Sequence, residues 1–324
     1  FALYDAFGWR QSALFGIGIA AGIILYHASF GFTAAWREVV SSGNGAGLRA
    51  QMIMLDVTVL VFTPLIAAGE FAGLSLRGSV APLSLAVPVG AFIFGIGMQL
   101  GGGCASGTLF TAGGGNMRMV VTLAAFIAGS LLGTWQWALW QEAPSFAPVA
   151  LSQELGVVGG ISVSLLLFAG IYAASSRYER YRSRRSGALA LATTPPRHSA
   201  PPAHSLLHGP WPLIAGALAL ALVNISTLLI AGRPWGVTSA FALWGAKGAS
   251  LIGFDVSDWT YWARSASADS LNQSVFADVT SVMNFGIVFG AMAAAALAGK
   301  FAPVWRLSTL DILTAVIGGL LIGY

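Results

Sequence analysis

The chain alternates between long apolar segments and shorter polar ones. Eight apolar segments occur, and each is close to the roughly 20 residues that a helix needs to cross a bilayer: residues 12–26, 51–69, 82–100, 119–140, 156–174, 211–231, 281–299 and 309–324. Uninterrupted apolar runs favour membrane helices over the short alternating strands of an outer-membrane barrel. We therefore expect an all-α, polytopic helical membrane protein.

A basic segment that continues into proline- and serine-rich sequence divides the series, with five apolar segments before it and three after it. Such sequence is typical of a flexible connection. We expect a first membrane repeat at residues 1–175, a linker at 176–209 and a second membrane repeat at 210–324.

The composition supports a membrane protein and excludes several kinds of site. The 324 residues are 56% hydrophobic and only 9% charged, whereas about 25% of an ordinary soluble domain is charged. A single cysteine excludes an internal disulfide, and three of the four histidines lie in the linker. We therefore expect no metal site and no cofactor.

The basic residues predict the orientation of the chain. Six of the sixteen lysines and arginines fall between Arg177 and Arg197, and basic clusters beside membrane spans are usually cytoplasmic. Counting spans back from a cytoplasmic linker places the N-terminus and the Gln141–Glu154 loop outside the cytoplasm. We expect the protein to lie in the bacterial inner membrane. The net charge of +4 then reflects the orientation of the chain in that membrane, and we expect no nucleic-acid partner.

One apolar segment ends in an unusual glycine-rich stretch, "GIGMQLGGGCASGTLFTAGGGN" at Gly95–Asn116. Non-helical backbone cannot face lipid, because its polar groups would lack partners. The stretch therefore predicts a broken or re-entrant helix that restarts with Ser106 as N-cap. A helix N-terminus favours an anion, so the candidate pathway residues are Cys104, Gly101, Gly102, Gly103, Ser106, Gly107 and Thr108.

Simpler roles exist for these residues. Glycines in membrane helices often serve close helix packing, and a lone Cys104 can be a small buried hydrophobe. Asp56 and Asp311 lie within apolar sequence, where an acid is a functional candidate by default. Both acids can also act as interfacial helix caps.

The two halves of the chain contain similar sequences in the same order. "FGFTAAW" at Phe30–Trp36 matches "WGVTSAF" at Trp235–Phe241, and "GAFIFG" at Gly90–Gly95 resembles "GGLLIG" at Gly318–Gly323. An odd number of spans per copy predicts an inverted repeat, whose half-helix ends meet near the midplane. Because the counterpart of the glycine break would follow residue 324, we expect the second repeat to be incomplete. The matched pair adds further candidate pathway residues: Gly31, Thr33, Gly236 and Thr238.

The stretches "SFGFTAAWR", "GIGMQLGGGCASGT" with its following "AGGGN", and "WGVTSA" resemble the YeeE/YedE family, the sulfur-transport family whose characterised members take up thiosulfate. The resemblance implies an hourglass-shaped, pseudo-two-fold helical transporter. It also implies that Cys104, like the family's central cysteines, hydrogen-bonds thiosulfate and passes it on. The chain departs from the family pattern because "SFGFT" has no cysteine and no second glycine-cysteine motif is present.

These observations predict an importer of a small sulfur-containing anion, with thiosulfate first and other sulfur oxyanions or selenium species as alternatives. The expected partners are this anion, the lipid bilayer and a soluble sulfur-carrier protein in the cytoplasm, and we expect no enzyme activity. Two other functions remain open: a membrane sulfurtransferase that forms a persulfide on Cys104, and a passive anion channel.

Overall fold

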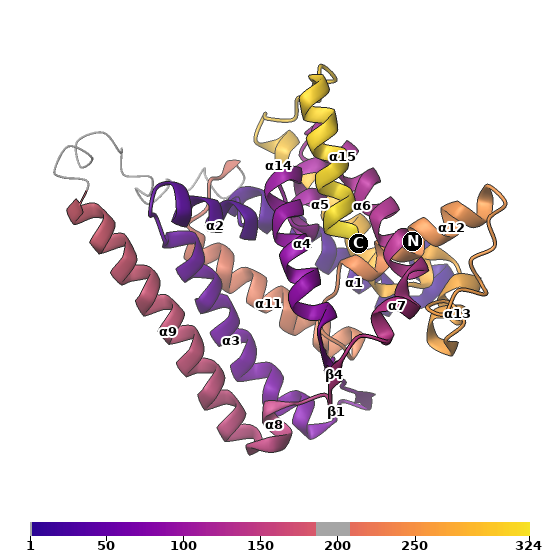
Figure 1. The fold of residues 1–324 in the computed structure, drawn as a ribbon, viewed down its shortest axis with the longest axis horizontal. Coiled ribbons are helices and arrows are strands. Elements are labelled where there is room, and N and C mark those ends of the chain that lie inside the picture. The colour runs from indigo at the N-terminus through magenta and orange to yellow at the C-terminus, as the bar shows by residue number, and fades with distance from the viewer. Residues whose placement is uncertain (1, 186–207) are drawn as a thin grey trace.

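The protein is mainly helical across the residues that the computed structural model describes, 2–185 and 208–324. The helices are α1 Ala2–Ala28, α2 Phe32–Ser41, α3 Ala46–Ala68, α4 Ala86–Gly101, α5 Ala105–Gly113, α6 Met117–Trp135, α7 Trp137–Gln141, α8 Leu151–Glu154, α9 Gly156–Arg185, α11 Leu213–Ala231, α12 Thr238–Leu251, α13 Ser265–Asn272, α14 Val279–Leu297 and α15 Thr309–Gly323, with a 3-10 turn η2 at Val275–Ala277. Two short antiparallel pairs join β1 Glu70–Phe71 to β2 Leu74–Ser75, and β3 Leu83–Ser84 to β4 Ser145–Phe146. Figure 1 shows the arrangement.

Seven of the described helical segments are long and apolar enough to cross a membrane. This confirms the polytopic helical membrane protein expected from the sequence. The eighth apolar segment, 309–324, forms α15, which has 15 residues and is shorter than the others. The segment predicted at 119–140 forms two helices, because the backbone leaves the helical conformation at Gln136.

The basic segment begins as helix. Helix α9 runs on through Arg177 to Arg185, so the first part of the predicted linker continues the fifth apolar segment. The proline- and serine-rich part of the predicted linker, residues 186–207, lies outside the described residues.

The tightest helix pair is α1 with α14, which lie in different halves of the chain. Glycines form the contact: a Cβ atom added at Gly22 would lie 2.2 Å from the backbone oxygen of Ile287, and one at Gly290 would lie 2.1 Å from that of Ile19. Small residues allow membrane helices to approach this closely and gain packing energy along their whole length. The halves are therefore joined by backbone-to-backbone contact.

Several other large contacts also pair a helix before the linker with a helix after it. Helix α3 packs on α11, as α14 packs on α1, and α1 also packs on α11. Helix α15 packs on both α4 and α6, again across the halves. The helices on either side of the linker therefore interleave and do not form two separate bundles.

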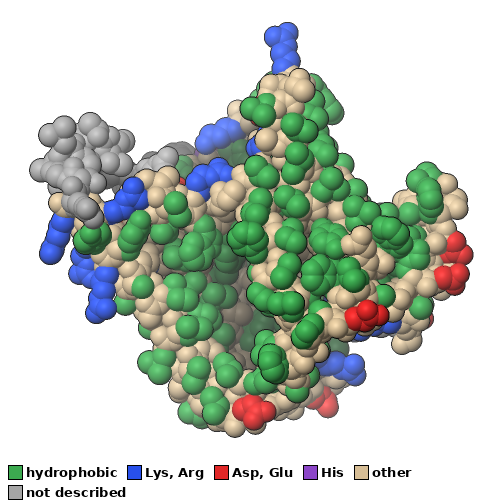
Figure 2. Space-filling model, in the orientation of Figure 1, with side chains coloured by type: hydrophobic (Ala, Val, Ile, Leu, Met, Phe, Trp, Pro, Cys, Tyr) green, Lys and Arg blue, Asp and Glu red, His purple; other side chains and the backbone are tan. Residues whose placement is uncertain are grey.

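Helix α9 lies at the periphery, beside α3 (Figure 1). Its apolar side chains, such as Val158 and Leu166, are 78% and 72% exposed, as expected for a helix that faces lipid. An ion pair between Arg49 and Glu179 ties it to α3. Figure 2 shows a mostly apolar face, with lysine and arginine side chains gathered along its upper edge around the end of α9.

Candidate functional site

The glycine-rich stretch breaks the helix where the sequence predicts. Helix α4 ends at Gly101, and Gly102 takes a left-handed conformation, with φ of 87°, that favours glycine. Gly101 has a different role, because a Cβ atom added at Gly318 of α15 would lie 2.2 Å from its backbone nitrogen. Of the glycines proposed for the pathway, Gly101 thus serves helix packing and Gly102 serves the turn.

Cys104 is the N-cap of the second half-helix, α5. The sequence predicted Ser106 for this position, which is wrong, because the backbone is already helical at Ala105 and only Cys104 is extended. The thiol is 7% exposed, and its sulfur lies 3.6 Å from the hydroxyl oxygen of Ser106. The structure therefore places the thiol and the Ser106 hydroxyl together at the start of α5.

The first turn of α5 has backbone N–H groups without acceptors among the described residues. The carbonyl of Cys104 accepts from the backbone N–H and the hydroxyl of Thr108, both at 2.8 Å. Within the described part of the chain, the N–H groups of Ala105, Ser106 and Gly107 have no acceptor, and no side chain caps the helix. Unpaired N–H groups at a helix N-terminus suit an anion.

Two arginines hold the other side of the break. Arg118, from α6, donates to the carbonyl of Leu100 at 2.7 Å, and Arg37, from α2, donates to that of Gln99 at 3.3 Å. Both cations therefore cap the C-terminal end of α4, where carbonyls lack partners. The sequence analysis gave neither arginine a role at the break.

The two matched motifs also interrupt the helices, so the chain has three breaks: the first before α2, the second between α4 and α5, and the third before α12. Helix α2 begins after Gly31 as N-cap, and α12 begins after Val237, one residue beyond Gly236. Thr33 is buried, and its hydroxyl oxygen has no partner among the described residues, whereas Thr238 is exposed. The matched threonines therefore have different surroundings.

Each of these two breaks is held by a buried amide side chain that the sequence analysis missed. Gln51, the sixth residue of α3, donates to the carbonyl of Gly31 at 3.5 Å. Asn284, the sixth residue of α14, donates to the carbonyl of Val237 at 2.9 Å. A polar amide inside an apolar span was the available signal.

Residues beside all three breaks belong to one apolar cluster. It contains Phe30 from the first break and Ala105 from the second, and the partly buried Val237 from the third packs against it. Phe126 and Phe241 meet at its centre, with ring centroids 4.7 Å apart. The structure thus brings residues beside the three breaks to a common apolar core.

A cavity of about 340 Å³ lies beside the third break. Thr238 and Ser239 line it together with Ser130, Thr134 and Tyr261. Burial raises the pKa of Tyr261 above its ordinary value, although Arg264 opposes the shift. The Tyr261 hydroxyl thus remains a neutral donor at neutral pH.

The two acids within apolar sequence differ. Asp311 forms a capping box with Ser308 at the start of α15 and lies 3.8 Å from Arg118, so it is a helix cap. Asp56 has one buried carboxylate oxygen without a partner among the described residues. No described group of three or more His, Cys, Asp or Glu side chains is arranged to hold a metal.

Removal of the amide that holds the third break is expected to destabilise the protein. Asn284→Leu removes the donor of the partly buried Val237 carbonyl, which costs about 1–2 kcal/mol in the free energy of unfolding. The matched control is Asn224→Leu, because Asn224 donates only to a carbonyl of its own helix, that of Leu220. Denaturation of the purified variants measures both costs, and equal costs would contradict a role for Asn284 at the break.

Comparison with known proteins identifies the family of the chain. The model of a family described as sulphur transport matches residues 27–324. The probable transporter YedE of Salmonella typhimurium is 26% identical over 176 residues, which cover 54% of this chain and 42% of YedE. The chain thus spans about two fifths of the length of this relative.

Two relatives are named thiosulfate transporter TsuA. The Escherichia coli protein is 23% identical over 318 residues, covering 95% of this chain and 80% of TsuA. The Spirochaeta thermophila protein is 30% identical over 100 residues, covering 31% of this chain and 29% of that protein. Since the family model matches almost its whole length, the chain belongs to the sulphur transport family.

Proposed function

We propose that the protein imports a small sulfur oxyanion, thiosulfate first, and that the anion passes Cys104 at the break between α4 and α5. One observation carries the proposal: the buried thiol stands at the start of a helix whose first three N–H groups have no acceptor among the described residues. These groups can donate to the oxygens and the terminal sulfur of thiosulfate without a fixed positive charge. Neutral donors bind an anion and also let it leave.

Other buried donors support an anion pathway. The Thr33 hydroxyl and the Trp235 indole nitrogen are buried and have no partner among the described residues. Both residues stand at the breaks that flank the common core. A buried donor without a partner is costly, and a passing anion would satisfy it.

The two-repeat architecture belongs to the same proposal. If α1 corresponds to α11 and α3 to α14, as the FGFT and WGVT motifs indicate, the α1–α14 contact is the counterpart of the α11–α3 contact. The equivalent positions of Gln51 and Asn284 support the same correspondence. We assign residues 1–175 and 210–324 to two inverted repeats around one pathway.

We further propose that the end of α9 and the linker lie in the cytoplasm, with the N-terminus and the Gln141–Glu154 loop on the other side of the bacterial inner membrane. The basic side chains around the end of α9 support this orientation (Figure 2). A soluble sulfur-carrier protein at the cytoplasmic side is a further part of the proposal.

Cysteine labelling tests the orientation. Ser183, near the end of α9, and Ser145, in β4, are both exposed, whereas the native Cys104 is buried. An impermeant maleimide is expected to label Ser145→Cys in intact cells, and Ser183→Cys only after lysis. Labelling in the reverse order would overturn the topology.

Transport itself is tested in cells and in vesicles. A cell that lacks sulfate uptake is expected to grow on thiosulfate as sole sulfur source only when it carries this protein. Labelled thiosulfate is expected to arrive unchanged inside proteoliposomes, with saturable flux. Arrival of the outer sulfur alone would indicate a sulfurtransferase, and non-saturable flux would indicate a channel.

A further inference from the structure

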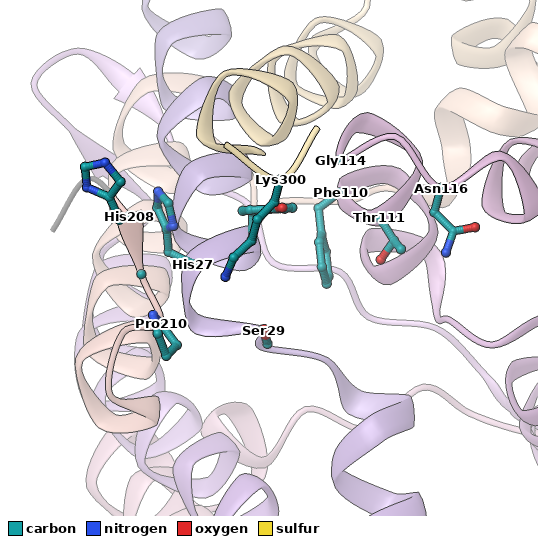
Figure 3. A pocket seen from close by; sticks show the side chains of 11 residues that line it. His27, Ser29, Phe110, Thr111, Gly114, Asn116, His208, Pro210 and Lys300 are labelled. Carbon is teal, nitrogen blue, oxygen red and sulfur yellow. The ribbon is translucent and has the colours of Figure 1, made fainter. Parts of the chain in front are cut away.

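A second cavity, of about 280 Å³, lies where several helices end. The end of α1, the end of α5, the segment before α11 and the residue Lys300 after α14 surround it (Figure 3). It does not include any residue of the three breaks except Ser29, which precedes the first of them.

The chemistry of this pocket is that of an anion site. Three basic side chains line it, those of His27, His208 and Lys300, and Ser29 and Thr111 add hydroxyl groups. None of the described residues that line it is an aspartate or glutamate. In Figure 3 the Lys300 side chain extends between His27 and Phe110.

Lys300 differs from the cations that stabilise the fold. Arg49, Arg118 and Arg233 each pair with a carboxylate, and the ammonium of Lys247 donates to the carbonyls of Leu271 and Gln273. Within residues 2–185 and 208–324, Lys300 makes neither an ion pair nor a side-chain hydrogen bond. Its charge is therefore available to a ligand.

The rest of the pocket is held in place. His27 is 4% exposed, and its ring stacks on that of Trp211 with centroids 5.4 Å apart. The backbone N–H of Trp211 donates to the carbonyl of His27 at 2.8 Å. One basic group is thus fixed in the wall while Lys300 reaches in from the opposite segment.

The pocket and Cys104 lie at opposite ends of one helix. Cys104 precedes α5, and Phe110, Thr111 and Gly114 line the pocket at its far end. Seven residues separate Cys104 from Thr111, which is about 10 Å along a helix. The pocket therefore lies one short helix away from the thiol.

We propose that this pocket is a second binding site for an oxyanion, which receives the transported sulfur oxyanion after it has passed Cys104. The identity of the anion rests on the proposed function, whereas the pocket's affinity for oxyanions does not. The oxygens of a lipid phosphate share this chemistry, so the test separates the free anion from the headgroup.

The chain provides its own control, because it contains only two lysines, Lys247 and Lys300. In purified protein, an amine-reactive reagent followed by mass spectrometry measures the labelling rate of each. Sulfate or thiosulfate at about ten times its Kd is expected to slow labelling of Lys300 about tenfold. The rate at Lys247, which donates to two carbonyls of the chain, is expected to stay unchanged.

Variants locate the effect. His208→Gln removes an imidazole from the lining of the pocket. It is expected to raise the anion concentration that protects Lys300 by up to about fivefold, the range for one lost hydrogen-bond donor at an exposed position. Arg306, like Lys300, lies in the segment between α14 and α15, but it is exposed and does not line the pocket. Arg306→Gln is therefore expected to leave the protection of Lys300 unchanged. Equal effects of the two variants would reduce the site to general electrostatic attraction and overturn the proposal.

Labelling in lipid nanodiscs and a parallel thiosulfate transport assay separate a headgroup site from an anion site, and the pocket from the proposed function. Protection by anionic lipid in nanodiscs, but not by sulfate or thiosulfate in detergent, would assign the pocket to a headgroup and overturn the proposal. Labelling of Lys300 that no anion slows, in protein that still transports thiosulfate, would overturn the pocket and leave the proposed function intact. Protection by sulfate in protein that does not transport thiosulfate would support the pocket and refute the proposed function.

Discussion

Cys104→Ala is expected to fold like the parent protein and to lose most of its thiosulfate uptake. The two side chains are close in size, and among the described residues the thiol makes one hydrogen-bond contact, with the Ser106 hydroxyl at 3.6 Å. A lost hydrogen bond to a charged group is worth about 1.5–3 kcal/mol, which corresponds to a roughly ten- to hundredfold weaker affinity. Initial uptake rates in proteoliposomes, at matched protein content, measure the loss.

Cys104→Ser separates two uses of the thiol. It keeps a donor at the N-cap but cannot exchange sulfur, so partial rescue would support hydrogen-bonded passage. A serine variant as inactive as the alanine variant would favour a persulfide step. Normal uptake by well-expressed Cys104→Ala would refute the proposed role of the thiol.

Gly22→Ala is expected to cause the largest loss of stability among single-methyl changes in α1. The added carbon would lie 2.2 Å from the Ile287 backbone oxygen, and a backbone atom cannot turn away as a flexible side chain can. Overpacking of this kind costs about 3 kcal/mol in the free energy of unfolding. Thermal unfolding of the purified variant, followed by loss of the monodisperse peak, measures it.

The matched control lies on the same helix. A Cβ atom at Gly16 would meet nothing within 4 Å, so Gly16→Ala is expected to stabilise α1 by roughly 0.5–1 kcal/mol through helix propensity. The two substitutions are therefore expected to have opposite signs. A destabilisation of the same size at both positions would contradict the packing of α1 on α14.

The sequence predicted the helix breaks well because a break has a local cause. The run of three glycines before Cys104 and the aromatic-glycine pairs of the two matched motifs act locally, so the ends of α1, α4 and α11 fell close to the predicted positions. The N-cap was placed two residues late, at Ser106, because serine caps helices more often than cysteine. The actual start depends on the backbone at Gly103 and Cys104.

What the sequence could not show depends on contacts between distant segments. The roles of Gln51 and Asn284 follow from carbonyls of another segment, and sequence spacing does not reveal such pairs. The role of Gly101 likewise depends on Gly318, 217 residues further along the chain. The pocket around Lys300 was missed because four separate segments build it.

The glycine contact between α1 and α14 has a consequence for motion. Many transporters move substrate by rocking one repeat against the other as rigid bodies. Here such rocking would separate α1 from α14, two helices of different repeats whose backbones touch. Alternating exposure of the pathway is therefore expected to come from small local shifts of the half-helices at their breaks, within a scaffold that stays closed.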